Sequence, residues 1–247
     1  MKNKINEMKK IKWTDVRLVL MIGLLAFLYS FSSKRNEERK LLKTEVKFAG
    51  ENMPFVTDEM VNNLLIQNFS SVTTIRKDKV DLNRLERELD DHEMIADAQV
   101  YATVDGTLKA LVTQKTPIAR VSNESSSYYI DYEGNKMPLS DNFSARVPLV
   151  FGKINEENRK GLTEVFQKIH DDDFLKKNIT GAKILESGSL LMTNRNYDYG
   201  ILFGKPINVD KKFNNYKAFF QHAMKDTLIG EYKMINLKFT QQVVCTK

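Results

Sequence analysis

The sequence predicts an α+β protein with a single N-terminal transmembrane helix, an intermediate domain and a C-terminal mixed β-domain with flanking helices. Three observations predict this architecture. A long apolar segment lies near the N-terminus. In the rest of the chain, segments with the apolar spacing of a helix occur among segments with the alternating pattern of a strand. Turn-forming residues separate these segments. The 247 residues are 42% hydrophobic and 28% charged, a globular composition that excludes wholesale disorder.

The positive net charge is confined to the N-terminal part of the chain. The formal net charge is +6, but residues 1–43 contain eleven Lys and Arg against four Asp and Glu, and the remainder contains 27 against 28. A nucleic-acid-binding domain needs a basic surface of its own, so this distribution argues against a nucleic-acid partner. The single cysteine, Cys245, excludes an intramolecular disulfide framework, and three scattered histidines predict no metal site.

Residues 13–33 are predicted to form the transmembrane helix. From residue 18 onward this segment has no ionisable side chain other than that of Tyr29. Residues 13–31 would span about 28 Å as a helix, close to the ~30 Å hydrocarbon core of a bilayer. Trp13 and Tyr29 would then lie near opposite interfaces, where amphipathic aromatic side chains are enriched.

The span divides a predicted cytoplasmic tail, residues 1–12, from a charged connector, residues 34–43. Lys and Arg are almost balanced between the two sides, so charge gives only a slight preference for a cytoplasmic N-terminus. Long C-terminal domains translocate largely regardless of charge, which favours the same orientation. Two alternatives stay open: a signal peptide cleaved near Ser30-Phe31-Ser32, and a buried helix of a soluble domain.

Residues 44–121 are predicted to form the intermediate domain, in the order strand, helix, helix, strand, strand. Residues 44–48 alternate as a half-buried strand. Thr57 caps the first helix and Asp81 begins the second. The expected apolar stripes of the two helices are Met60, Val61, Leu64 and Leu65, and Leu82, Leu85 and Leu89. Asp105-Gly106 predicts a tight hairpin turn between the last two strands. Pro117 is expected to end the last strand.

Residues 122–247 are predicted to form the C-terminal β-domain. Its helices are expected to begin near Asn155 and at Asp210. The predicted strands lie at 128–131, 136–139, 146–152, 182–185, 190–193, 200–203 and 234–244. The last is the longest, because Ile235, Leu237 and Phe239 alternate with polar residues.

The order of these elements resembles the FtsQ/DivIB family of bacterial cell-division proteins, in which a POTRA domain precedes a C-terminal β-domain. Residues 46–50 with 55–57 resemble the POTRA opening, and residues 95–100, 106–108 and 114–119 resemble the family pattern "V-x-x-A-x-V … TL … E-x-x-P-x-A". Residues 129–134, 148–152 and 235–239 resemble "D-x-x-G", "P-x-x-x-G" and "I-D-L-R-Y". The chain departs from these motifs at Gln114, Asn236, Lys238 and Phe239, where the family has Glu, Asp, Arg and Tyr.

The resemblance implies a non-catalytic, single-pass scaffold that recruits or links division proteins at the septum for septal peptidoglycan synthesis. It implies an inner-membrane location with a cytoplasmic N-terminus and a periplasmic C-terminal domain. The implied partners are the small coiled-coil proteins FtsB and FtsL, with other divisome members at the POTRA domain.

By position, the implied partner-binding residues fall in the last predicted strand: Lys238, Phe239, Thr240, Gln241, Gln242, Val243 and Val244. A strand at a sheet edge has unpaired backbone groups and can accept an added strand. The alternative is an ordinary core strand without a partner. Phe239 is accordingly either an interface anchor or a core residue.

Catalysis has little support in the sequence. His92 and His170 lie beside aspartates, which is the residue pairing of a membrane-anchored periplasmic hydrolase, but it is also typical of a polar helix end. No nucleophile elbow, zinc-protease or dinucleotide-binding pattern occurs, so no enzyme activity and no cofactor are predicted. A POTRA-bearing transport component is the other alternative, although too few residues remain for a transmembrane barrel.

Overall fold

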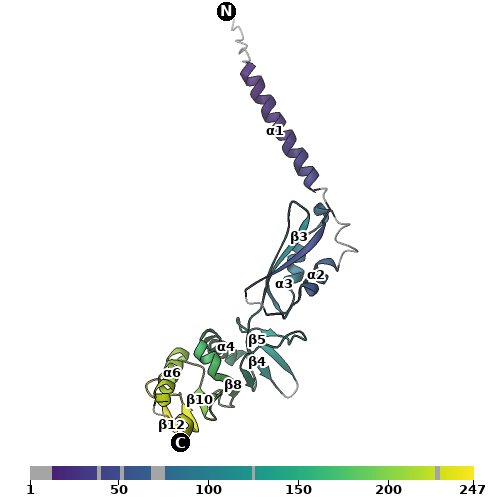
Figure 1. Cartoon of the computed structure of the whole chain (residues 1–247). Helices are drawn as coiled ribbons and strands as arrows, with labels where there is room; N and C mark the ends of the chain where they lie inside the picture. Colours follow the sequence, from purple (N-terminus) through teal and green to yellow (C-terminus); the bar gives the residue numbers. More distant parts are fainter. Residues whose placement is uncertain (1–12, 38–39, 51–52, 68–75, 124–125, 226–228) are drawn as a thin grey trace, which may run out of the picture. The chain divides into compact units, whose positions relative to one another are not determined.

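The computed structural model describes residues 13–37, 40–50, 53–67, 76–123, 126–225 and 229–247 (Figure 1). The chain forms two compact units. The first comprises residues 1–47, 58–89 and 98–111, and the second comprises residues 48–57, 90–97 and 112–247.

Helix α1 (Trp13–Glu37) is the apolar helix expected near the N-terminus. By length and composition, its residues 13–36 suffice to cross a membrane, and none of this stretch is buried in the structure. The apolar side chains of α1 therefore have no protein core around them within the described residues, which is typical of a membrane anchor and argues against the buried helix of a soluble domain.

The predicted order strand, helix, helix, strand, strand is present in the residues that follow. These elements are β1 (Lys43–Ala49), α2 (Asp58–Ile66), α3 (Leu82–Asp90), β2 (Ile95–Ala102) and β3 (Thr107–Gln114), with the short 3-10 helix η2 (Lys77–Lys79) ahead of α3. The strands form a sheet in the order β1-β3-β2. The backbone N–H of Val100, in the edge strand β2, donates to Glu86 Oε1 at 2.7 Å, so a side chain of α3 covers part of this edge.

The helical stripes of this domain are the ones that the apolar spacing predicts. Val61 and Leu65 of α2 are buried, as are Leu85 and Leu89 of α3. Each pair is four residues apart, which places both side chains on one face of the helix. The Asp105-Gly106 turn is also confirmed: Gly106 has φ +90° and donates its N–H to the carbonyl of Thr103 at 3.1 Å.

The second sheet has nine strands in the order β12-β11-β10-β9-β8-β7-β4-β5-β6. Their bounds are β4 (Pro117–Ser122), β5 (Ser127–Asp131), β6 (Lys136–Met137), β7 (Leu149–Phe151), β8 (Ile179–Ile184), β9 (Leu190–Asn194), β10 (Gly200–Gly204), β11 (Met234–Asn236) and β12 (Val244–Thr246). The pairs β4–β7, β7–β8 and β10–β11 are parallel and the other pairs are antiparallel, so the sheet is mixed, as expected.

Pro117 begins a strand and does not end one. Strand β3 ends at Gln114, and β4 begins at Pro117 and joins the nine-stranded sheet. Proline is tolerated as the first residue of a strand because no ladder hydrogen bond needs its missing N–H there.

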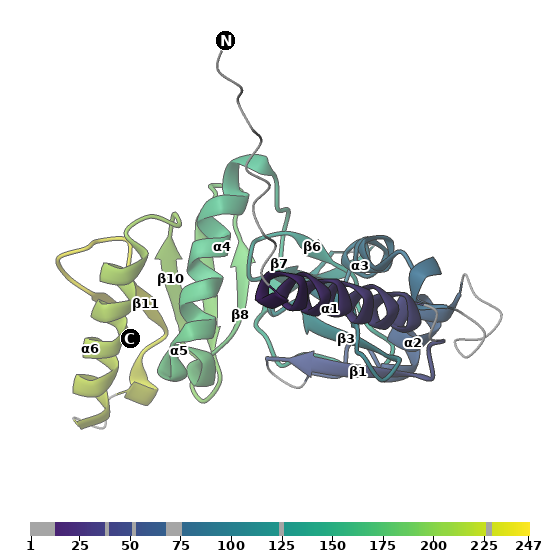
Figure 2. The same cartoon turned by 90° about the horizontal axis from the view of Figure 1, so that it is seen from above.

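Three helices pack on the nine-stranded sheet: α4 (Glu156–Asp171), α5 (Asp173–Asn178) and α6 (Val209–Lys225). Figure 2 shows them as one layer over strands β8 and β10. Asn155 caps α4 as predicted, in a reciprocal capping box with Asn158. Aromatic side chains from the helices and strands share the core, among them Phe166, Tyr199, Phe203, Phe213 and Tyr216.

Candidate partner-binding surface at the C-terminal sheet edge

The expected long strand over residues 234–244 is wrong. Strand β11 ends at Asn236, and the chain returns as β12, which pairs antiparallel with β11 through Ile235 and Cys245. The side-chain Oδ1 of Asn236 accepts the backbone N–H of Lys238 at 3.0 Å. An Asn side chain that bonds two residues ahead mimics a backbone turn, and this turn ends the strand despite the continuing apolar alternation.

All seven expected partner-binding residues lie in the loop between β11 and β12 or at the start of β12. Lys238, Phe239, Gln241, Gln242 and Val244 are exposed, and Thr240 and Val243 are half-buried. Phe239 is 51% exposed and is therefore not a core side chain. The preceding apolar residues Ile235 and Leu237 are fully buried. The exposed residues therefore begin at Lys238, in the loop after β11.

Helix α6 holds this loop in place. The side-chain Nδ2 of Asn215 donates to the backbone carbonyl of Thr240 at 3.0 Å. A shallow groove of about 360 Å³ separates the loop from α6, with Ala218, Phe219 and His222 on the helix side and Gln241 on the loop side. Sequence reasoning missed these helix residues, although 215, 218, 219 and 222 have the spacing of one helical face.

Strand β12 is the last strand of the nine-stranded sheet and pairs with β11 alone in the described part of the chain. Its other side therefore presents backbone N–H and C=O groups on which a further strand can be added. The loop residues lie beside this edge, because Val244 is both the last of the expected residues and the first residue of β12.

The ionisable groups around this edge are structural. Partial burial raises the pKa of the Cys245 thiol, which disfavours the nucleophilic thiolate. Lys247 forms an ion pair with Glu231, which raises the pKa of its ammonium group, and it lies over the ring of Tyr232. A raised thiol pKa is the opposite of what a nucleophilic cysteine needs, so Cys245 is not an activated nucleophile in this arrangement.

The histidines that suggested a hydrolase have structural surroundings. Burial lowers the pKa of His92 despite the opposing charge of Glu93, and its Nδ1 accepts the backbone N–H of Met94 at 3.2 Å. Asp171, which follows His170, accepts a hydrogen bond from the hydroxyl of Tyr132 at 2.8 Å. No group of three His, Cys, Asp or Glu side chains in the described residues could hold a metal ion.

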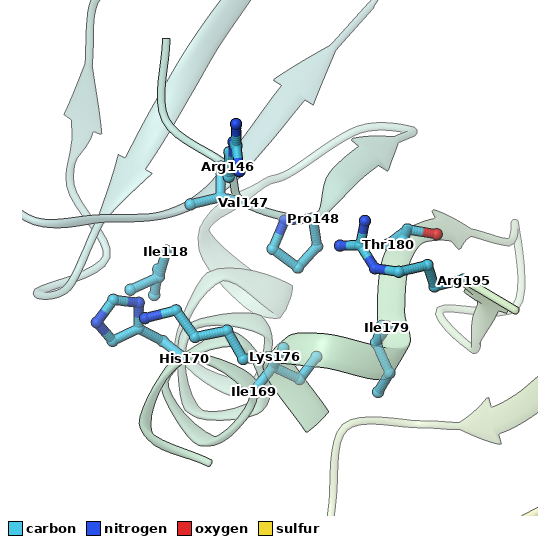
Figure 3. A pocket seen from close by; sticks show the side chains of 10 residues that line it. All are labelled: Ile118, Arg146, Val147, Pro148, Ile169, His170, Lys176, Ile179, Thr180 and Arg195. Atoms are coloured by element: carbon cyan, nitrogen blue, oxygen red, sulfur yellow. The ribbon is translucent and has the colours of Figure 1, made fainter. Parts of the chain in front are cut away.

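His170 does line a pocket, of about 270 Å³, which Figure 3 shows from close by. Arg146, Lys176 and Arg195 line it as well, over a floor that includes Ile118. None of the ten labelled residues is a carboxylate, a serine or a cysteine. The lining of this pocket is therefore basic and apolar, with one hydroxyl side chain, that of Thr180.

The segment 200–205, whose glycines are one residue too close together for a phosphate-binding loop, is strand β10 and the turn after it. Buried Lys212 donates from Nζ to the carbonyl oxygens of Phe203 at 3.0 Å and Lys205 at 2.8 Å. Its ammonium group thus stabilises the end of the strand, and burial lowers its pKa. The segment has a structural role.

Comparison with known proteins identifies both domains. Residues 116–246, which are 131 of the 247 residues, match the family model described as FtsQ/DivIB, C-terminal related, and residues 43–113 match a POTRA-like domain. No curated protein matches the chain. Among solved structures, the chain is similar to the major extracytoplasmic domain of the trans isomer of the cell-division protein DivIB from Geobacillus stearothermophilus, at 11% identity and a TM-score of 0.29, covering 46% of this chain and 95% of that one. On the strength of the two family models, the chain belongs to the FtsQ/DivIB family of bacterial cell-division proteins.

Proposed function

We propose that this protein is a non-catalytic scaffold of the division machinery that recruits partners of the FtsB and FtsL type through residues 238–244. The proteins of its family are non-enzymatic division proteins. One observation carries the proposal: five of the seven residues that correspond by position to the family's partner-binding segment are exposed, and the set lies beside the outer edge of β12.

Binding would combine strand addition with one aromatic anchor. A partner segment paired with β12 would gain main-chain hydrogen bonds, which contribute affinity with little sequence preference. Phe239 would then supply specificity, since large aromatic side chains are frequent hot spots of interfaces. Lys238, which is exposed beside it, would favour an acidic residue at the rim of the partner.

The remaining parts of the chain would place this surface at the septum. Helix α1 would cross the inner membrane once, with the N-terminal tail in the cytoplasm and both folded domains in the periplasm. The POTRA-like domain would contact further members of the divisome. Partner recruitment would thus precede septal peptidoglycan synthesis.

The proposal predicts that a fluorescent fusion to the cytoplasmic N-terminus of the full chain forms a band at midcell in dividing cells. Proteins of the FtsB and FtsL type should co-purify with it from membranes in mild detergent. A matched fusion that carries only residues 1–43 should insert in the membrane but lose the partners. Uniform envelope fluorescence of the full chain, or its purification without these partners, would contradict the proposed function.

A further inference from the structure

The tip of the β2–β3 hairpin lies beside the C-terminal end of α1. Val104, at the tip, lines one cavity with Tyr29, Ser32, Ser33, Arg35 and Asn36 of that helix. Within this unit, the hairpin and the end of the apolar helix therefore lie at the same level along the helix axis.

Hydrogen bonds from two further segments hold this arrangement together. Lys77, in η2, donates from Nζ to Asn36 Oδ1 at 3.4 Å and to the carbonyl of Thr103 at 2.9 Å. The backbone N–H of Leu42 donates to the carbonyl of Gly106 at 2.8 Å. The end of α1, η2, the connector and the hairpin tip thus meet at one place.

The length of α1 sets the depth of that place in a membrane. At about 1.5 Å per residue, a helix from Trp13 to Ser33 spans about 30 Å, which is the thickness of the hydrocarbon core. Residues 29–36 are therefore where the helix leaves the hydrocarbon. Val104 lines a cavity with these residues and would then be at the level of the lipid headgroups.

The hairpin tip exposes apolar side chains close to basic residues, a combination that suits the headgroup region of a bilayer. Two apolar side chains are open to solvent, Val104 at 69% exposure and Leu42 at 64%. Among the described basic residues, Arg35 lines the cavity with Val104, Lys77 bonds to the carbonyl of Thr103, and the exposed Lys40 and Lys43 lie close to Leu42 in the chain. Asp105, at the turn, is the acidic residue of the tip. Apolar side chains surrounded by Lys and Arg favour the interface of a bilayer that contains anionic lipids.

We propose that the β2–β3 hairpin tip inserts into the headgroup region of the bilayer that α1 spans, with Val104 and Leu42 as the inserted side chains and the surrounding basic residues on anionic phospholipid headgroups. This inference rests on the proposed single membrane span. It also explains why basic residues follow the span, although the positive-inside rule favours Lys and Arg on the cytoplasmic side. The POTRA-like domain would be held against the membrane by its own hairpin.

The chain offers a direct test because it contains a single tryptophan, Trp13. In the Trp13→Phe background, Val104→Trp places the only indole at the hairpin tip. The matched control in the same background is Ile207→Trp, which replaces an apolar residue of 58% exposure in the other unit. The full chains are reconstituted in vesicles of equal parts phosphatidylcholine and phosphatidylglycerol, with and without lipids brominated near the top of the acyl chain.

The expected result is a blue-shifted emission and strong bromine quenching for the Val104→Trp chain, and neither for the Ile207→Trp chain. Adding Lys40→Gln and Lys43→Gln, or omitting phosphatidylglycerol, should lower the quenching of the Val104→Trp chain at least twofold. The unmodified chain reports the span itself, since Trp13 should be quenched whenever α1 is inserted. Quenching of Trp13 without quenching at position 104 would overturn the hairpin inference and leave the span standing. Absence of quenching at both positions would overturn both, and quenching that is independent of phosphatidylglycerol would overturn the role of the basic residues.

Discussion

The side-chain amide of Asn215, in α6, donates a hydrogen bond to the backbone carbonyl of Thr240, 25 residues further along the chain, at 3.0 Å. This bond joins a core helix to the loop between β11 and β12. Because Phe239 and Gln241 flank Thr240, the bond also fixes the part of the loop that presents them outward. The shape of the candidate partner surface therefore depends on a helix that is distant in sequence.

Asn215→Ala should loosen this loop and leave the fold intact. The loss of one hydrogen bond is expected to lower the free energy of unfolding by about 0.5–1.5 kcal/mol. Backbone amides of residues 240–243 should exchange faster with deuterium, and partner affinity should fall. Asn214→Ala, at the exposed neighbouring position, is the control and should change neither quantity. Equal exchange in the two variants would refute the role of the bond.

Gly106→Ala should destabilise the POTRA-like domain for two separable reasons. Gly106 has φ +90°, and a Cβ there would meet the carbonyl oxygen of Lys40 at 2.7 Å. Gly50 has a similar φ, +86°, but open space around it. Gly50→Ala is therefore expected to cost only the backbone strain, about 1–3 kcal/mol, and Gly106→Ala should cost more. Chemical unfolding of both variants tests this, and an equal cost would contradict the close approach of the connector.

Lys212→Met should lower the free energy of unfolding by about 1–3 kcal/mol, because two carbonyl oxygens inside the second unit lose their donor. The methionine retains the apolar volume, so the effect reports the hydrogen bonds. Lys211→Met, at the exposed neighbouring position, is the matched control and should unfold at the wild-type denaturant concentration. The assignment of Lys212 as a structural residue fails if both variants are as stable as the wild type.

The protein is expected to lose stability in acid when the carboxylate of Asp172 becomes protonated. Burial alone would raise the pKa of its carboxyl group, but Lys217 and the backbone N–H groups of Leu175 and Phe174 bond to the carboxylate, so the pKa lies below 3.8. The stability that this carboxylate contributes is therefore present above pH 3.8 and is lost as the pH falls through the lower pKa of the folded state.

Asp172→Asn keeps an oxygen to cap α5 but removes the titrating group, so its melting temperature should depend less on pH in the acid range. Asp173→Asn changes the exposed neighbour and should retain the wild-type dependence. Thermal unfolding followed by circular dichroism as a function of pH tests this. Parallel curves for the wild type and Asp172→Asn would contradict the prediction.

Local signals in the sequence predict most of the helices and turns. The capping residue Asn155, the apolar stripes of α2 and α3 and the Asp105-Gly106 turn each depend on neighbours within a few residues, and the structure confirms them. Helix α5 was missed because it has only six residues and its cap, Asp172, lies within an acidic triplet that gives no separate signal.

The expected partner-binding residues were predicted to lie in a strand, but the structure places most of them in a loop. Ile235, Leu237 and Phe239 alternate as in a strand, yet only the first two are buried, because the Asn236 side chain turns the chain at Lys238. The contribution of α6 could not be predicted, since the bond between Asn215 and Thr240 depends on how the helix packs on the sheet. Local patterns thus locate a surface, and tertiary packing decides its shape.

The central claim is that the exposed C-terminal loop binds division partners, and the affinity of Phe239→Ala tests it most directly. Phe151, in β7, is the matched control because it is an exposed phenylalanine of the same sheet, at 48% against 51% for Phe239. Full chains in lipid nanodiscs are titrated with the purified partner pair of the FtsB and FtsL type, and the melting temperature of each variant is recorded. The account predicts that Phe239→Ala weakens binding roughly thirtyfold or more, the loss of a hot spot of about 2 kcal/mol, with an unchanged melting temperature, and that Phe151→Ala binds as the wild type does. Wild-type affinity of Phe239→Ala, or an equal loss in Phe151→Ala, would contradict it.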